Sequence, residues 1–392
     1  MKGKDWLPLI FLVVSVFVFN MSEFMPIGLL TDIAESFDIS ESKAGLIISV
    51  YAWAVAILSL PLMLLLRKME YRRMLLMCVV IFAAFQFLTG LSQTYGMLMV
   101  SRLGVAVAHA VFWSIAAPMA VRIVEPRYAK VALSAVSAGT SIAMIVGLPL
   151  GRVIGIALGW RATFIVIGVI SLLVLVALAL VFPRLENPGT FTVKRLPGLL
   201  RDRVIAGIYV VIAVYVTGYY TMYSYIEPFL LDAGLSENGV TAMLTVLGLA
   251  GIGGSILFSK LYDRYRLTFL VSGMCFASLC MLALEPVSDS VLLLTLVVII
   301  MGAATTAFTV AIQNELLRAS PQDASAVAMS LFSGIFNAGI AMGSIIGGAV
   351  TDSLSVGDVG TVGFVFGICA TAFAATYLVA KIKSSERAKT QQ

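Results

Sequence analysis

Long apolar runs separated by short polar turns fill almost the whole chain. A helix needs about 20 consecutive apolar residues to cross the hydrocarbon core of a bilayer, and most of the runs reach that length. The pattern therefore predicts an all-α membrane protein with twelve transmembrane helices, near residues 6–30, 43–66, 73–92, 96–121, 130–155, 161–182, 204–231, 239–258, 267–287, 290–317, 324–350 and 361–381.

The longest polar interruption is "PRLENPGTFTVKRLPGLLRDR", residues 183–203, which holds three prolines and five basic residues. It is predicted to be a cytoplasmic linker between an N-terminal six-helix bundle, 1–182, and a C-terminal six-helix bundle, 204–392. The two halves also share a pattern. Gly147 and Gly151 of the fifth span recur as Gly343 and Gly347 of the eleventh, 196 residues later.

Composition agrees with a membrane protein, since 60% of the residues are hydrophobic and 12% are charged, against about 25% in soluble proteins. The basic residues also orient the chain. With the N-terminus inside, 22 of the 26 Lys and Arg residues fall in inside segments, and the outside loops hold only Lys43 and Arg161. The positive-inside rule thus predicts that both termini are cytoplasmic.

Four stretches resemble a known family: "EFMPIGLL" (23–30), "RLGVAVAHAVFWSIA" (102–116), "GLPLGRVIGIALGWRATF" (147–164) and "SKLYDRYR" (259–266). The chain resembles the bacterial drug/sugar:proton antiporters of the major facilitator superfamily. Within it, the chain is most similar to sugar efflux transporters that export arabinose and isopropyl-thiogalactoside. The resemblance implies the major facilitator fold, two bundles with a central cavity, and a place in the bacterial inner membrane.

Ionisable side chains inside apolar runs are costly, so each is a candidate for function. Glu23 interrupts the first span and His109 lies near the middle of the fourth. A buried carboxyl can exchange a proton, and an imidazole changes charge near physiological pH. We expect these two residues to couple transport to protons. The alternatives are a structural Glu bonded to a neighbouring helix and a packing histidine.

Further polar and aromatic residues lie within the spans and are candidates for substrate binding. Some have equally plausible structural roles, such as an ion pair for Arg102 or interface anchoring for the tyrosines. The substrate-binding candidates are Asn20, Arg102, Trp113, Tyr220, Tyr223, Glu227, Thr306, Gln313 and Asn337.

A second group of residues is expected to serve conformational change. Small residues four apart let helices approach closely, and the resemblance implies that this glycine-rich fifth span forms a tight interface between the halves. Asp263 and Arg264 of "KLYDRYR" are expected to form salt bridges that hold one conformation closed. The conformational candidates are Gly147, Pro149, Gly151, Asp263 and Arg264.

The motifs of other function classes are missing from the sequence. The single histidine excludes an HExxH zinc site, and neither G-x-S-x-G nor G-x-x-x-x-G-K-[ST] occurs. We therefore expect no enzymatic activity, cofactor, metal site or nucleic-acid partner. We expect a monomer in the bilayer that exports small sugars or sugar-like molecules in exchange for protons. The alternative substrates are more hydrophobic drugs, and a channel is a third class, disfavoured by the repeat.

Overall fold

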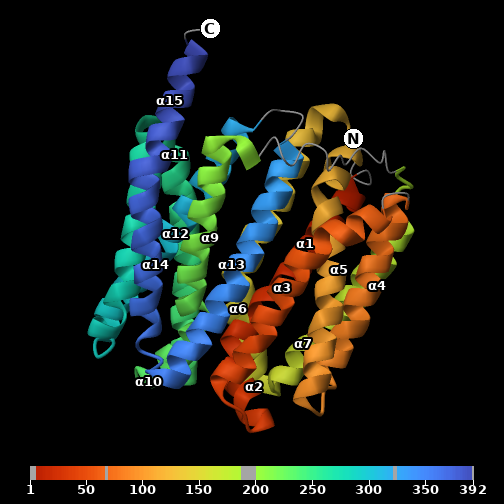
Figure 1. Ribbon diagram of the computed structural model, residues 1–392. Helices are drawn as coiled ribbons and strands as arrows, with labels where there is room; N and C mark the ends of the chain where they lie inside the picture. The colour runs from red at the N-terminus through yellow and green to blue at the C-terminus, as the bar shows by residue number, and fades with distance from the viewer. Residues whose placement is uncertain (1–5, 67–68, 187–199, 321–324, 391–392) are drawn as a thin grey trace. The chain divides into compact units, whose positions relative to one another are not determined.

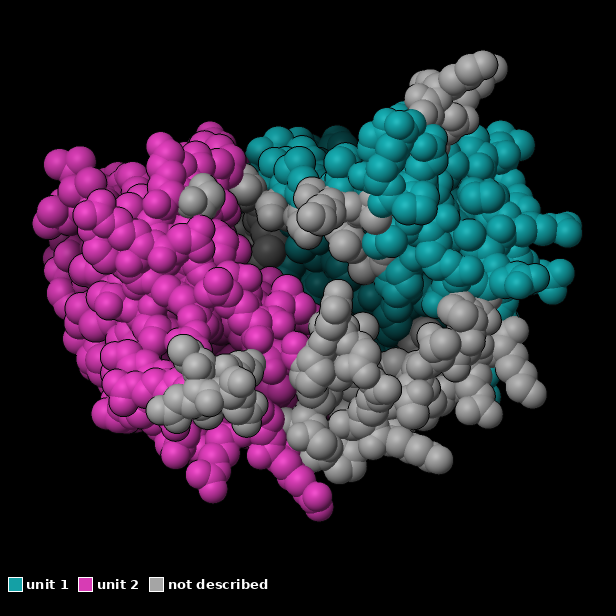
Figure 2. All heavy atoms as spheres, turned by 90° about the horizontal axis from the view of Figure 1, so that it is seen from above, with its two compact units in different colours: residues 1–190 teal, residues 191–392 magenta. Residues whose placement is uncertain are grey.

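The computed structural model describes residues 6–66, 69–186, 200–320 and 325–390, and most of these residues are helical (Figure 1). Residues 1–190 and 191–392 form two compact units (Figure 2). Much of the predicted linker, residues 187–199, lies outside the described residues. The helices of the first unit are α1 (Leu7–Phe24), η2 (Met25–Leu29), α2 (Leu30–Phe37), α3 (Glu41–Leu66), α4 (Tyr71–Gly90), α5 (Tyr95–Arg122), η3 (Pro126–Tyr128), α6 (Ala129–Leu158) and α7 (Trp160–Val181).

The second unit begins with α9 and contains the remaining helices. These are α9 (Arg203–Tyr223), α10 (Ile226–Asp232), α11 (Glu237–Ala283), η5 (Glu285–Val287), α12 (Val291–Ala319), α13 (Ser325–Ser353), α14 (Val359–Phe373), the π-helical turn η6 (Ala374–Leu378) and α15 (Val379–Thr390). In each unit the first long helix is central to the packing: α1 packs on α6 and α7, and α9 packs on α13 and α14.

The membrane-spanning character predicted from the sequence is confirmed. In the part of the chain that the structure describes, eleven helical stretches are long and apolar enough to cross a bilayer. The 30-residue helix α6 occupies the place of the predicted fifth span. The eighth and ninth predicted spans share one helix, the 47-residue α11.

Helix α11 nevertheless has two arms that turn back on each other. The rings of Phe258 and Phe269 lie 6.3 Å apart, whereas eleven residues of straight helix would separate them by about 16 Å. Gly251 and Gly273, one from each arm, both pack against α12, beside Thr306 and Ala304 respectively. The two arms therefore correspond to two of the eleven stretches, and α6 occupies the place of the remaining predicted span.

The first span is interrupted rather than continuous. The α-helix ends at Phe24, and a 3₁₀ turn with Pro26 as its second residue runs from Met25 to Leu29. A break of this kind frees backbone carbonyls that must find new partners inside a membrane. Arg152 of α6, completely buried, supplies one, since its Nη1 donates to the carbonyl of Gly28 at 2.7 Å.

Glycines of α6 allow this close approach to the first span. A β-carbon added at Gly147 would lie 3.2 Å from the Cα of Met21, and one at Gly151 would lie 2.0 Å from Cγ of Met25. Pro149 lies between them, inside the helix. The glycine face thus packs against α1 and η2 of its own unit. The interface between halves that the resemblance implies stays a prediction.

The second unit repeats these contacts in the same register. A β-carbon at Gly343 would lie 2.4 Å from the carbonyl oxygen of Thr217, and one at Gly347 would lie 2.4 Å from that of Thr221. Both glycines and both of their partners on the first helix lie 196 residues after their counterparts in the first unit, Gly147 with Met21 and Gly151 with Met25.

Turn and cap residues keep the same offset of 196 residues. Ser40 and Ser236 each accept from the backbone N–H three residues ahead, as do Thr94 and Ser290. Asp38 and Gly234 both take left-handed backbone conformations, with φ of 52° and 83°. The internal repeat is therefore in constant register from the first helix of each unit to its glycine-rich fifth span.

Candidate functional site

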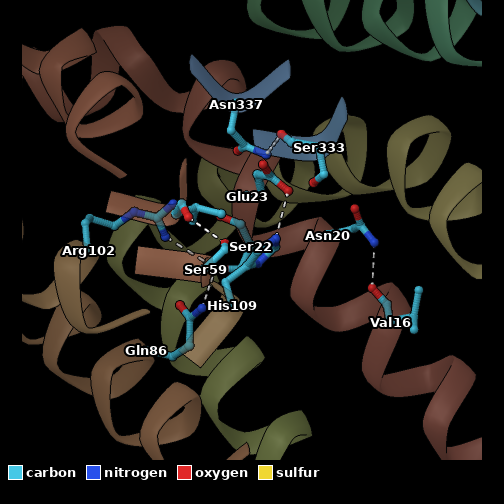
Figure 3. A network of polar contacts seen from close by, with 11 residues as sticks. Val16, Asn20, Ser22, Glu23, Ser59, Gln86, Arg102, His109, Ser333 and Asn337 are labelled. Carbon is cyan, nitrogen blue, oxygen red and sulfur yellow. Dashed lines mark hydrogen bonds and ion pairs between the residues drawn. The ribbon is translucent and has the colours of Figure 1, made fainter. Parts of the chain in front are cut away.

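Glu23 and His109 face each other inside the first unit (Figure 3). Oε2 of Glu23, one residue before α1 ends, lies 3.3 Å from Nε2 of His109 in the middle of α5. Their side chains are 11% and 2% exposed. The sequence singled out both residues from separate spans, and the structure brings them together.

Arg102 lies beside this pair and is completely buried on α5. Its Nη1 donates to Oγ of Ser22 at 3.3 Å and its Nη2 to the carbonyl of Ser22 at 3.1 Å. Gln86 of α4 donates from Nε2 to the same Ser22 hydroxyl. The guanidinium also lies 4.6 Å from the ring centroid of Tyr51, a cation–π contact that offsets part of its desolvation.

Aromatic rings enclose the imidazole of His109. The ring of Tyr51 lies 5.5 Å away in a T-shaped contact, Phe19 lies 6.0 Å away, and Trp113, one turn along α5, lies 5.9 Å away. Trp113 is half-buried, so part of its ring remains accessible. These rings exclude water from the imidazole, and its Nδ1 has no hydrogen-bond partner in the described part of the chain.

The charges of the cluster explain what it can do. When Glu23 is a carboxylate and His109 is a neutral imidazole, the pair carries one negative charge. The fixed positive charge of Arg102 balances it. Adding one proton to the pair leaves Glu23, His109 and Arg102 together with one net positive charge. In a buried setting such an uncompensated charge is costly. The net charge of this buried cluster is therefore set by the protonation state of the pair.

Asn20 is buried on the same helix but does not join this network. Its Nδ2 donates to the carbonyl of Val16, one turn earlier in α1, at 2.9 Å. The amide thus satisfies part of its hydrogen-bonding capacity within its own helix, and among the described residues it forms no hydrogen bond to Glu23.

The candidates at the end of the seventh span differ in exposure. Tyr220 is buried on α9, against Phe336 and Gly343 of α13. Tyr223 is half-buried and stacks on Tyr219 at 5.2 Å. Glu227 lies in the first turn of α10 and is fully buried. Tyr223 therefore keeps accessible surface, whereas the side chain of Tyr220 is buried between α9 and α13.

The remaining candidates of the second unit are scattered over α12 and α13. Thr306 packs against Gly251 of α11. Gln313 lines a cavity of about 320 Å³ together with Asp263, Tyr262 and Asn314, among others. Asn337 is buried on α13, where its Nδ2 donates to the carbonyl of Ser333 at 3.0 Å (Figure 3).

The charged network at "KLYDRYR" uses residues that the sequence did not single out. Asp263 and Arg264 are exposed. Arg266 instead donates from Nε and Nη2 to both carboxylate oxygens of Glu315, a buried residue of α12, and Tyr262 donates to the same carboxylate. Arg266 also pairs with Glu386 of α15. Glu315 was identifiable in principle, as an acidic residue near the end of an apolar run.

Comparison with known proteins agrees with this architecture. A family model described as Major Facilitator Superfamily matches residues 12–344. A bacterial homologue of the human lysosomal transporter Spinster, inward-facing and unoccupied, has a similar structure, with a TM-score of 0.81, 15% identity, and 98% of each chain covered.

The inward-facing, occupied structure of such a Spinster homologue has a TM-score of 0.78 and 16% identity, covering 97% of this chain and 99% of that one. At these identities the likeness shows the fold alone. The family match covers most of the sequence, and the twelve spans and repeated units fit it. The chain is therefore a member of the Major Facilitator Superfamily, a multi-pass membrane transporter rather than an enzyme.

Proposed function

We propose that this protein exports small sugars or sugar-like molecules in exchange for protons, by alternating access, across the inner membrane of a bacterium with both termini in the cytoplasm. The observation that carries the proposal is the buried Glu23–His109 pair beside Arg102. Ionisable side chains are costly inside a membrane and usually functional there, and a proton-driven carrier needs a titratable group in that position.

The proposed cycle follows from the charge balance of the site. A proton from the outside adds one positive charge to the pair, which the low-polarity surroundings and Arg102 oppose. Its release on the inside restores a neutral cluster. Downhill proton movement thereby supplies the driving force for uphill export of substrate. Drug-like cations are the alternative substrates, because stacked tyrosines such as Tyr219 and Tyr223 also accept planar aromatic molecules.

Transport by the purified full-length chain in proteoliposomes tests the proposal. The panel contains labelled arabinose, isopropyl-thiogalactoside and a planar aromatic cation, each measured with and without a pH gradient. We expect uphill movement of a sugar that a protonophore abolishes. Glu23→Gln should lose uphill transport but keep counterflow, which needs no net proton turnover.

A matched control is Glu35→Gln, the same substitution at an exposed position of α2. It should behave like wild type. Normal uphill transport by Glu23→Gln would contradict the assignment of Glu23 as the proton carrier, and transport of the aromatic cation alone would replace sugars with drugs as the substrate.

A further inference from the structure

Three tyrosines form a ladder along one face of α9. The rings of Tyr215 and Tyr219 are stacked with centroids 6.4 Å apart and planes 7° apart, and those of Tyr219 and Tyr223 are 5.2 Å and 20° apart. The residues are four apart in sequence, so they share a helix face. Phe308 of α12 supports the ladder, with its ring 4.4 Å from that of Tyr215.

The internal repeat places this ladder at the counterpart of the proton site. Helix caps, turns and glycine contacts keep an offset of 196 residues between the units. Residues 196 positions after Glu23 and His109 are Tyr219 and Thr305. The two hydroxyl side chains therefore occupy in α9 and α12 the positions that the acid and the imidazole occupy in α1 and α5.

The structure also brings these two residues together. The side-chain hydroxyl of Thr305 lies near the hydroxyls of both Tyr215 and Tyr219. Among the described residues, however, neither the Thr305 hydroxyl nor the Tyr215 hydroxyl forms a well-aligned hydrogen bond. Tyr215 is only 2% exposed. A buried hydroxyl without a partner is destabilising, and a bound molecule with hydroxyl groups would offset that cost.

Exposure separates the ladder from the packing tyrosines nearby. Tyr219 and Tyr223 are half-buried although they lie well inside the span Arg203–Asp232. By contrast, Tyr209 donates its hydroxyl to the carbonyl of Ala328, and Tyr225 donates to that of Ser344. The packing tyrosines have their partners in α13, whereas Tyr219 and Tyr223 keep accessible surface that a ligand can contact, and Tyr215 continues the ladder beneath them.

We propose that Tyr215, Tyr219, Tyr223 and Thr305 form a substrate-binding surface of the second unit for a small neutral polyhydroxylated molecule. The inference rests on the proposed export function and specifies its substrate class. Aromatic faces fit the C–H face of a sugar ring, and hydroxyls both donate to and accept from sugar hydroxyls. None of the four side chains is charged near neutral pH, so proton binding and substrate binding are assigned to equivalent places in different repeats.

Binding of labelled isopropyl-thiogalactoside to the purified full-length chain tests this assignment. Tyr219→Phe and Thr305→Val each remove one hydroxyl and keep the shape, and Tyr219→Ala removes the ring. We expect the hydroxyl variants to weaken binding about tenfold, and Tyr219→Ala to weaken it further. Tyr209→Phe, which removes a packing hydroxyl, should leave the affinity unchanged. All variants are first checked for a wild-type elution profile in detergent.

Transport separates this inference from the proposed function. The ladder variants should raise the KM for sugar counterflow while the remaining transport still responds to a pH gradient, the opposite of Glu23→Gln. Unchanged sugar affinity in Tyr219→Ala, or an equal loss in Tyr209→Phe, would overturn the binding surface. If Glu23→Gln stays coupled while the ladder variants lose affinity, only the proton assignment falls. Loss of aromatic-cation binding alone would overturn the substrate class.

Discussion

Arg102 and Ser22 are joined by two hydrogen bonds although 80 residues separate them. The contact ties α1, one residue before Glu23, to α5, two turns before His109. Because the acid and the imidazole sit on these same two helices, their separation of 3.3 Å depends on how Arg102 holds α1 against α5. The arginine therefore links the two helices that carry the pair.

Removing the Ser22 hydroxyl should destabilise the first unit. In Ser22→Ala the amide of Gln86 loses its acceptor, while Arg102 keeps the backbone carbonyl. We expect a loss of about 1–3 kcal/mol, measured as a lower thermal midpoint in detergent. Ser15→Ala is the matched control in the same helix, because the one hydrogen bond of its buried hydroxyl among the described residues goes to the carbonyl of Phe11, one turn earlier. Equal shifts in both variants would contradict the network.

Glycine contacts predict opposite effects for the same substitution at two positions of α13. In Gly343→Ala the new β-carbon would meet the carbonyl oxygen of Thr217 at 2.4 Å, whereas at Gly334 nothing lies within 4 Å. Gly343→Ala should cost about 1–3 kcal/mol by overpacking. Gly334→Ala should be neutral or stabilising, since alanine favours helix by about 1 kcal/mol. Thermal unfolding of both variants decides the matter, and a stable, active Gly343→Ala would refute the close contact.

The two carboxylates around Arg266 should contribute unequally. Glu315 is 1% exposed and bonds to both Arg266 and Tyr262, whereas Glu386 is 51% exposed. Glu315→Ala breaks a buried pair and should cost about 3 kcal/mol. Glu386→Ala removes a surface pair and should cost about 0–1 kcal/mol. Chemical denaturation of the purified variants measures both, and a larger loss at Glu386 would mean that α15 is the main support of this network.

Hydropathy predicted the spans because length and apolarity alone decide whether a helix can cross a bilayer. It did not predict how those spans are built. The 3₁₀ turn at Pro26 and the joining of two spans into α11 leave the run of apolar residues unchanged. Such features depend on partners far away in sequence, such as the Arg152 side chain that satisfies the freed carbonyl of Gly28.

Part of the candidate site could also be read from the sequence. Glu23 and His109 stand out because ionisable groups are rare in apolar runs. Ser22 and Tyr51 do not, since serine and tyrosine are common in membrane helices and only the fold shows that they contact Arg102. Thr305 was identifiable, because the glycine repeat already gives the offset of 196 residues that relates it to His109.

Membrane topology gives a direct test of the proposed orientation. On a background with the four native cysteines replaced, Gln93→Cys and Ser384→Cys place single thiols at two exposed positions. The first lies between α4 and α5, which is predicted to face outside, and the second lies in α15, predicted to face the cytoplasm. An impermeant maleimide should label Gln93→Cys in intact cells and Ser384→Cys only after permeabilisation. The reverse pattern would invert the orientation.

The last prediction concerns whether Glu23 and His109 act as one proton-binding unit. If they share a proton, the pH dependence of substrate counterflow belongs to the pair, and removing either titratable group should flatten it. We therefore expect Glu23→Gln and His109→Gln to show the same flattened profile, and the double variant to be no flatter than either one. Trp113→Phe alters a neighbouring ring without a titratable group, so it should keep the wild-type profile even if its rate falls. Independent sites would instead each leave one titration step in the single variants, and only the double variant would lose both. That outcome would show that the 3.3 Å contact between the two side chains does not govern coupling.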